Sequence, residues 1–214
     1  MNLEQYGIIS AESSTGLLLS SLENVEVLLP IIQKYAKELG ATTLAVAASL
    51  FVKRYAVSVA AASLDYFDFQ AKQLNWLDYA KFDSQQFKVY ITQQALPLIK
   101  DCWKQKVFYH LQKIIQILAR HCKISSIILW ENVAVRLNAV FKKNLECYRM
   151  SEVTTIFAQL TEPYPDWFFG QKNPLNEFIY ICHSHKQRTT CCRYYLLNKK
   201  EEAMSHCIVC PLNK

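Results

Sequence analysis

The sequence has little glycine, and its longest apolar stretch is not free of charge. Only four of its 214 residues are glycine, whereas 51% are hydrophobic. Such a chain has too few glycines for a β-sandwich with glycine-rich turns, and too much apolar material for a disordered chain. At this length one hydrophobic core is expected, and the composition favours a mainly α fold.

The charge distribution excludes one class of partner. The formal net charge is +6, and the lysines and arginines are spread along the chain. Nucleic-acid-binding modules usually gather their cations into one stripe, so no nucleic-acid partner is expected. A modest positive charge is more typical of a protein that attracts an anionic ligand or an acidic protein partner.

The sequence does not open with the pattern of a signal peptide, and its most apolar stretch contains two cations. The opening residues, Met-Asn-Leu-Glu-Gln, include an acid and lead into polar residues. The most apolar stretch, residues 41–64, is interrupted by Lys53 and Arg54. Each of these cations would cost at least ~2.5 kcal/mol near the middle of a bilayer. We therefore expect a buried core helix, no transmembrane segment and a cytoplasmic location.

Helical periodicity dominates most of the chain. Thr42 or Thr43 and Ser125 or Ser126 are suitable helix N-caps, and Gly40 is suited to end a helix. The first twenty or so residues have no sustained period. The pattern predicts helices over 22–39, 44–64, 104–121, 126–143 and 151–160, and a short strand over 87–92.

The periodicity ends near residue 175, after a loop that contains Pro163, Pro165 and Pro174. We expect residues 1–175 to form a helical body and residues 176–214 to form a small cysteine-bearing segment. The two parts are expected to pack as one compact unit. Five of the eight cysteines lie in this C-terminal segment.

Four of these cysteines form the pattern C-C-x14-C-x2-C: Cys191, Cys192, Cys207 and Cys210. Thiols stay reduced in the cytosol, so metal or redox chemistry is expected rather than a disulfide framework. Four thiolates can hold either a [2Fe-2S] cluster or a tetrahedral zinc ion. Adjacent cysteines in an extended chain point to opposite sides, which suits a broad cluster better than one ion. The residue types alone leave both metals open.

The cysteine block resembles the C-terminal motif of the ferric siderophore reductases of the FhuF type. The family pattern, Arg-x-x-Cys-Cys-x-x-Tyr followed by Cys-x-x-Cys-Pro-Leu, is matched by Arg188, Cys191, Cys192, Tyr195, Cys207, Cys210, Pro211 and Leu212. Residues 129–134, Leu-Trp-Glu-Asn-Val-Ala, are similar to the family's Leu-Trp-Gly-Asn-Val-Ala segment. Two features depart from the family: the gap between the cysteine pairs is longer, and Glu131 stands in place of glycine.

The resemblance implies an enzyme of iron acquisition, a cytoplasmic oxidoreductase that acts on metal ions. A [2Fe-2S] cluster on the four cysteines would receive electrons from a ferredoxin or flavoprotein and pass one to Fe(III) in a siderophore. Hard oxygen donors hold Fe(III) better than Fe(II), so reduction would release the iron. A siderophore-facing surface on the helical body is also implied. The candidate substrate-binding residues are Arg188 and Arg193 beside the cysteines, and Arg54, Trp130, Asn132, Arg136 and Lys142 on the helical body. The alternative is a core or N-terminal helix role for Trp130 and Asn132, and a solvated helix face for Arg54, Arg136 and Lys142.

Two other functions remain open. A four-cysteine zinc site would make the chain a helical interaction module, and an iron–sulfur cluster without a substrate would make it a redox sensor. The remaining cysteines have no partner at ligand spacing and are expected to be small buried side chains: Cys102, Cys122, Cys147 and Cys182. His183 and His185 are expected to be surface or structural residues rather than ligands.

Overall fold

The computed structural model describes residues 3–10, 16–72, 74–91, 96–97, 102–181, 186–197, 206–207 and 209–213. The α-helices are α1 (Val25–Leu39), α2 (Leu44–Ala56), α3 (Cys102–Cys122), α4 (Ser126–Asn144) and α5 (Met150–Leu160). Short helices are η1 (Glu4–Tyr6), η2 (Leu19–Glu23), η3 (Val57–Ala61), η4 (Leu64–Phe69), η5 (Leu77–Tyr79), η6 (Asp166–Phe168) and η7 (Tyr194–Leu196). The strands are β1 (Ile8–Ser10), β2 (Leu17–Leu18), β3 (Leu74–Asn75), β4 (Lys81–Asp83), β5 (Lys88–Ile91) and β6 (Leu96–Pro97).

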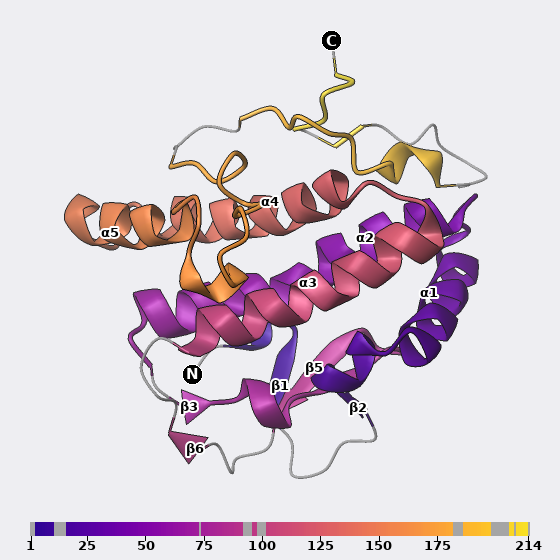
Figure 1. Cartoon of the computed structure of the whole chain (residues 1–214), viewed down its shortest axis with the longest axis horizontal. Coiled ribbons are helices and arrows are strands. Elements are labelled where there is room, and N and C mark those ends of the chain that lie inside the picture. Colours follow the sequence, from indigo (N-terminus) through magenta and orange to yellow (C-terminus); the bar gives the residue numbers. More distant parts are fainter. Residues whose placement is uncertain are drawn as a thin grey trace.

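The fold is mainly α, as the composition predicts. Helix α2 runs through the middle of the molecule and packs against α1, α3 and α4 (Figure 1). The small sheet lies on one side of this helical layer, and the C-terminal segment crosses the other side (Figure 1). The cysteine-bearing segment therefore rests on helices and not on the sheet.

Local signals define the helix ends. The side chain of Asn24 accepts a hydrogen bond from the Glu26 N–H at the start of α1, and Gly40 ends this helix with a φ of 63°. Thr43 caps α2 by accepting from the Val46 N–H. Ser125 caps α4 in the same manner, through the Ile127 N–H. The predicted helices 22–39, 104–121, 126–143 and 151–160 are confirmed, with shifts of a few residues at their ends.

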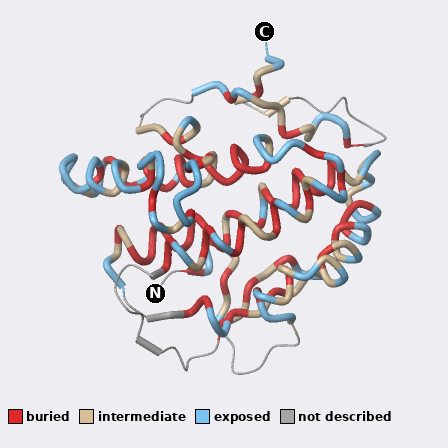
Figure 2. Tube along the Cα trace, in the orientation of Figure 1, coloured by how far each residue is buried: buried red, intermediate tan, exposed pale blue. Residues whose placement is uncertain are grey.

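The predicted helix 44–64 is longer than expected and changes its winding. After α2 the chain continues through two π-helical stretches, η3 and η4, and ends at Phe69. By length and composition, the whole stretch Leu44–Phe69 is compatible with a membrane span. Most of its residues are nevertheless buried inside the protein (Figure 2), and this burial is sufficient to account for its apolar character.

A four-stranded sheet has the order β1-β5-β4-β2. Strand β5 confirms the strand predicted over 87–92, and it pairs in parallel with β1 and antiparallel with β4. Phe82 of β4 packs edge-on against Phe51 and Tyr55 of α2. The sheet thus supports α2 from the side opposite to the cysteine segment.

The C-terminal segment is joined to the helical body near the start of α2. A β-bridge pairs Ala41 with Leu197, which directly follows η7. Cys182, His183 and His185 lie outside the described residues.

Candidate metal centre

The Cys-x2-Cys turn is closed by its own backbone and tied to the chain that precedes the other two cysteines. The Cys210 N–H donates to the Cys207 carbonyl at 2.8 Å, and the Asn213 side chain donates to the same carbonyl at 2.9 Å. The Arg188 N–H donates to the Val209 carbonyl at 2.9 Å. These contacts place both halves of the cysteine motif in neighbouring segments, although the sequence separates them.

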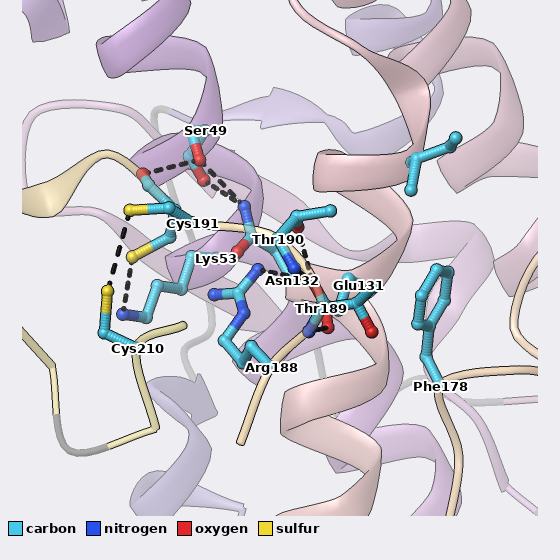
Figure 3. A network of polar contacts seen from close by, with 12 residues as sticks. Ser49, Lys53, Glu131, Asn132, Phe178, Arg188, Thr189, Thr190, Cys191 and Cys210 are labelled. Atoms are coloured by element: carbon cyan, nitrogen blue, oxygen red, sulfur yellow. Dashed lines mark hydrogen bonds and ion pairs between the residues drawn. The ribbon is translucent and has the colours of Figure 1, made fainter. Parts of the chain in front are cut away.

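The Cys-Cys pair is held by the middle of α2. The buried Ser49 hydroxyl donates to the Cys192 carbonyl at 2.9 Å. Asn132 of α4 in turn donates to the Ser49 hydroxyl at 3.0 Å and to the Ser49 carbonyl at 2.9 Å (Figure 3). Arg193 has a φ of 61°, so the chain turns directly after the pair, and its N–H donates to the Cys191 sulfur at 3.3 Å.

A second anchor comes from Glu131, the residue that departs from the family pattern. Its buried carboxylate accepts from the Thr189 N–H at 2.6 Å, from the Thr190 N–H at 2.8 Å and from the Thr190 hydroxyl. Arg188 donates to it at 3.5 Å (Figure 3). The carboxylate thus holds the three residues before the cysteine pair against α4.

The four thiols lie near one another and are grouped in pairs. The Cys191 and Cys210 sulfurs are 3.8 Å apart, the spacing of about 3.8 Å that two sulfurs at 2.3 Å from one tetrahedral ion would have. The Cys207 thiol lies close enough to Cys192 for that neighbour to help raise its pKa. Among the described residues, no three His, Cys, Asp or Glu side chains form a group that could hold one ion. The described part of the chain therefore has its thiols in pairs and does not have four sulfurs arranged around one point.

The thiols differ in their readiness to ionise. Burial alone would raise the pKa of Cys192, but the Lys53 ammonium, the Tyr194 N–H and Arg188 lower it overall. Burial and the neighbouring Cys192 raise the pKa of Cys207 to about 11. Only thiolates ligate metals, so Cys192 is prepared to act as a ligand, whereas Cys207 needs the positive charge of a metal to lose its proton.

Three cations surround the pair on the side of the helical body. The Lys53 ammonium lies 3.4 Å from the Cys192 sulfur, and the Arg136 side chain donates to the Lys53 carbonyl at 2.9 Å. The Arg188 guanidinium is directed into the space between Lys53 and Glu131 (Figure 3). Burial and repulsion from Arg188 both lower the pKa of Arg136, which indicates that the two guanidinium groups are close.

These residues fit an anionic metal centre. Arg188 is only 5% exposed, yet two of its nitrogens, Nε and Nη1, have no hydrogen-bond partner among the described residues. Lys53, Arg136 and Arg188 face only one described carboxylate, Glu131, which leaves an excess of two positive charges. A four-thiolate [2Fe-2S] centre in its oxidised form, or a four-thiolate zinc ion, carries two negative charges. Either centre would balance the site.

Of the seven candidate substrate residues, the structure brings four to the cysteines or to the residues that hold them. Arg188 and Arg136 lie beside the Cys-Cys pair, and Arg193 binds Cys191 through its backbone. Asn132 is fully buried and holds Ser49. Arg54, by contrast, stacks on the Phe87 ring at 4.2 Å from its centroid.

The other two lie elsewhere on α4. Lys142 is exposed in the last turn of the helix, about 16 Å along the helix axis from Glu131 at 1.5 Å per residue. Trp130 packs edge-on against Phe168 and lines a cavity of about 600 Å³. Thr189 forms part of the same cavity wall, together with the loop at residues 172–178.

The expectation that the other cysteines are buried holds for Cys122 and is wrong for Cys147. Cys122 lies in the core, and burial raises its pKa to about 11. Cys147 is exposed, because it follows the end of α4, where the chain turns away from the core. The side chain of Cys102 and all of Cys182 lie outside what the structure describes.

Sequence reasoning missed Lys53, Ser49 and the anchoring role of Glu131. No local pattern marks Ser49, since its partners Asn132 and Cys192 are 83 and 143 residues away. Lys53 and Arg54 are adjacent in the sequence, but neighbours on a helix point about 100° apart. The replacement of glycine by Glu131 was the one available signal, because an acid on a buried helix face requires partners.

Comparison with known proteins adds no family assignment. No protein-family model matches the chain, and no curated protein sequence matches it.

Proposed function

We propose that the chain is a ferric-siderophore reductase that carries a [2Fe-2S] cluster on Cys191, Cys192, Cys207 and Cys210. The observation that carries the proposal is the excess of positive charge beside four neighbouring thiols, from one buried and two half-buried cations. The resemblance of the cysteine block to the FhuF-type reductases favours the cluster over zinc.

The cluster, when bound, supplies one-electron redox chemistry. The substrate is Fe(III) in a siderophore: one electron converts it to Fe(II), which the hard oxygen donors of the chelate hold less tightly. A ferredoxin or flavoprotein is the proposed source of that electron, and the cytoplasm the proposed location.

The helical body offers a place for the chelate beside the cysteine segment. The cavity between the start of α4 and the loop at 172–178 is lined by Trp130, Phe178 and Thr189. Thr189 is two residues from Cys191 and is fixed by Glu131. A chelate in this cavity would therefore lie next to the segment that holds the cluster, with an aromatic surface to pack against.

The experiment is an anaerobic purification followed by iron, sulfide and zinc analysis and by EPR of the dithionite-reduced protein. We expect two irons and two sulfides per chain and an EPR signal from the reduced state. The reduced protein is then mixed with ferric hydroxamate, catecholate and carboxylate chelates, while a Fe(II)-specific chromophore monitors the product. We expect reoxidation of the protein and one Fe(II) for each electron.

Two outcomes would contradict the proposed function, and a third would exclude the proposed chelate site. Colourless protein with one zinc per chain would identify an interaction module stapled by a metal. Protein with a cluster that no ferric chelate reoxidises would identify a redox sensor. Equal reaction rates for the wild type and Trp130→Ala at low chelate concentration would exclude the Trp130 cavity as the chelate site.

A further inference from the structure

Lys53 is a cation of the helical body whose ammonium lies against a cysteine sulfur. It lies in the last turn of α2, with its ammonium 3.4 Å from the Cys192 sulfur and 5.7 Å from the centre of the Tyr194 ring. Among the described residues, no carboxylate lies within salt-bridge distance of it. Its charge is therefore directed at a thiol and is not neutralised by a described acid.

The backbone around Lys53 is fixed from two sides. Arg136 of α4 donates to the Lys53 carbonyl, and one turn earlier Ser49 is bound by Asn132 and binds the Cys192 carbonyl. The lysine and its target sulfur are thus attached to the same rigid pair of helices. The position of the Lys53 backbone relative to the Cys192 sulfur is therefore set by the packing of these helices, in the way that outer residues orient metal ligands.

We infer that Lys53 sets the electron affinity of the metal centre through the Cys192 sulfur. An electron added to a four-thiolate centre increases its negative charge, and a cation with a hydrogen bond to a ligand sulfur stabilises that form. The effect is larger in a partly buried site, where water screens the charge less. The inference rests on the proposed cluster, and it concerns the centre's potential, not the binding of a chelate.

The test is an anaerobic redox titration of four proteins: the wild type, Lys53→Met, Lys53→Arg and Arg54→Met. Lys53→Met keeps most of the side-chain volume and removes the charge. We expect it to lower the ratio of reduced to oxidised centre at a fixed potential at least tenfold, which is 59 mV for one electron. Lys53→Arg should stay close to the wild type. Arg54→Met is the matched control, because it removes the adjacent cation, which stacks on Phe87, and should not shift the potential.

Iron and sulfide content is measured for each variant before the titration. If Lys53→Met binds no cluster, Lys53→Gln, which retains a hydrogen-bond donor, is titrated in its place. Loss of the cluster from both neutral variants would mean that Lys53 retains the centre rather than tunes it, and would overturn the inference.

Equal potentials for Lys53→Met and the wild type, or an equal shift for Arg54→Met, would also overturn it. In these cases the proposed reductase function would stand if ferric chelates still reoxidise the protein. Conversely, a shifted potential in a protein that no chelate reoxidises would leave the role of Lys53 intact and remove the reductase.

Discussion

Buried charged groups of opposite sign lie beside the two ends of α4. At the C-terminal end, Asp65 is almost fully buried and accepts hydrogen bonds from Asn144, Tyr6 and Gln70, with the Lys143 ammonium 3.3 Å away. Near the N-terminal end, Arg188 is also buried and binds Glu131, but in the described part of the chain two of its nitrogens have no partner.

The comparison separates a structural site from one prepared for a ligand. Buried polar groups are normally satisfied, and a buried charge without partners is costly. The Asp65 cluster is complete within the chain, so stability alone explains it. The positive charge beside Cys192 is neutralised only when an anionic metal centre binds. We therefore expect the metal centre at the N-terminal end of α4 and not at the Asp65 cluster.

The largest expected effect comes from removing one of the four cysteines proposed as metal ligands. Cys210→Ser should abolish stoichiometric metal binding, because a hydroxyl does not replace a thiolate in a four-sulfur site. Metal content and the visible spectrum of freshly purified protein are the measurements. Cys147→Ser, at an exposed cysteine outside the site, is the control and should retain the full metal content. Retention of metal by Cys210→Ser would remove this residue from the ligand set.

Glu131→Gln tests the carboxylate that anchors the cysteine segment. The change keeps the size of the side chain but replaces one acceptor oxygen with a donor that faces the Thr189 and Thr190 N–H groups. Residues that orient metal ligands typically contribute 10–100-fold in affinity, so the rate of metal loss to a chelator should rise by about that factor.

Glu152→Gln is the matched control for Glu131→Gln. Glu152 also accepts a hydrogen bond from a backbone N–H, that of Arg149, but it lies on α5. An equal rate of metal loss in the two variants would show that Glu131 has no special role at the centre.

Asp65→Asn removes the buried negative charge beside the C-terminal end of α4. Burial would raise the pKa of Asp65, but hydrogen bonds from Asn144, Tyr6 and Gln70 and the charge of Lys143 lower it overall. Because the pKa is lower in the folded protein, the ionised Asp65 stabilises the fold above its ordinary pKa of about 4, and this contribution is lost as the pH falls through the folded value.

We expect Asp65→Asn to cost about 1.5 kcal/mol in the free energy of unfolding at pH 7, measured by chemical denaturation, with metal content unchanged. The difference from the wild type should shrink as the pH is lowered from about 5 to 3. A difference that is constant over this range would contradict the assignment. Glu38→Gln, at an exposed ion pair with Lys34, should have almost no effect.

The smallest expected effect distinguishes two buried serines of the same long helix. Ser49→Ala removes the hydrogen bond to the Cys192 carbonyl, whereas Ser58→Ala removes one to the Tyr6 carbonyl. Each should lower the free energy of unfolding by about 1 kcal/mol. Only Ser49→Ala should also accelerate metal loss, and an equal acceleration by Ser58→Ala would show that the effect is general destabilisation.

Periodic and local features were readable in the sequence. The apolar repeats, the caps Thr43 and Ser125 and the helix-ending Gly40 depend on residues within a turn of each other, so α1, α3, α4 and α5 were found close to their true bounds. The alternation that marks β5 is equally local. The π-helical continuation of α2 to Phe69 was not predicted, because it has the same composition as an α-helix.

Contacts between distant segments had no such signal. The parallel pairing of β1 with β5 joins residues about 80 positions apart. The sheet was therefore reduced to one strand in the prediction.

By itself, the sequence determined that the protein is mainly helical and that Cys191, Cys192, Cys207 and Cys210 are its candidate ligands, since both follow from residue type and short spacing. Only the tertiary structure decided that Lys53 rather than Arg54 faces these thiols, and that Glu131 and Ser49 hold them. The physical reason is that side-chain direction and long-range hydrogen bonds depend on how α2, α4 and the C-terminal segment pack. That packing is a property of the whole chain and not of any one stretch of it.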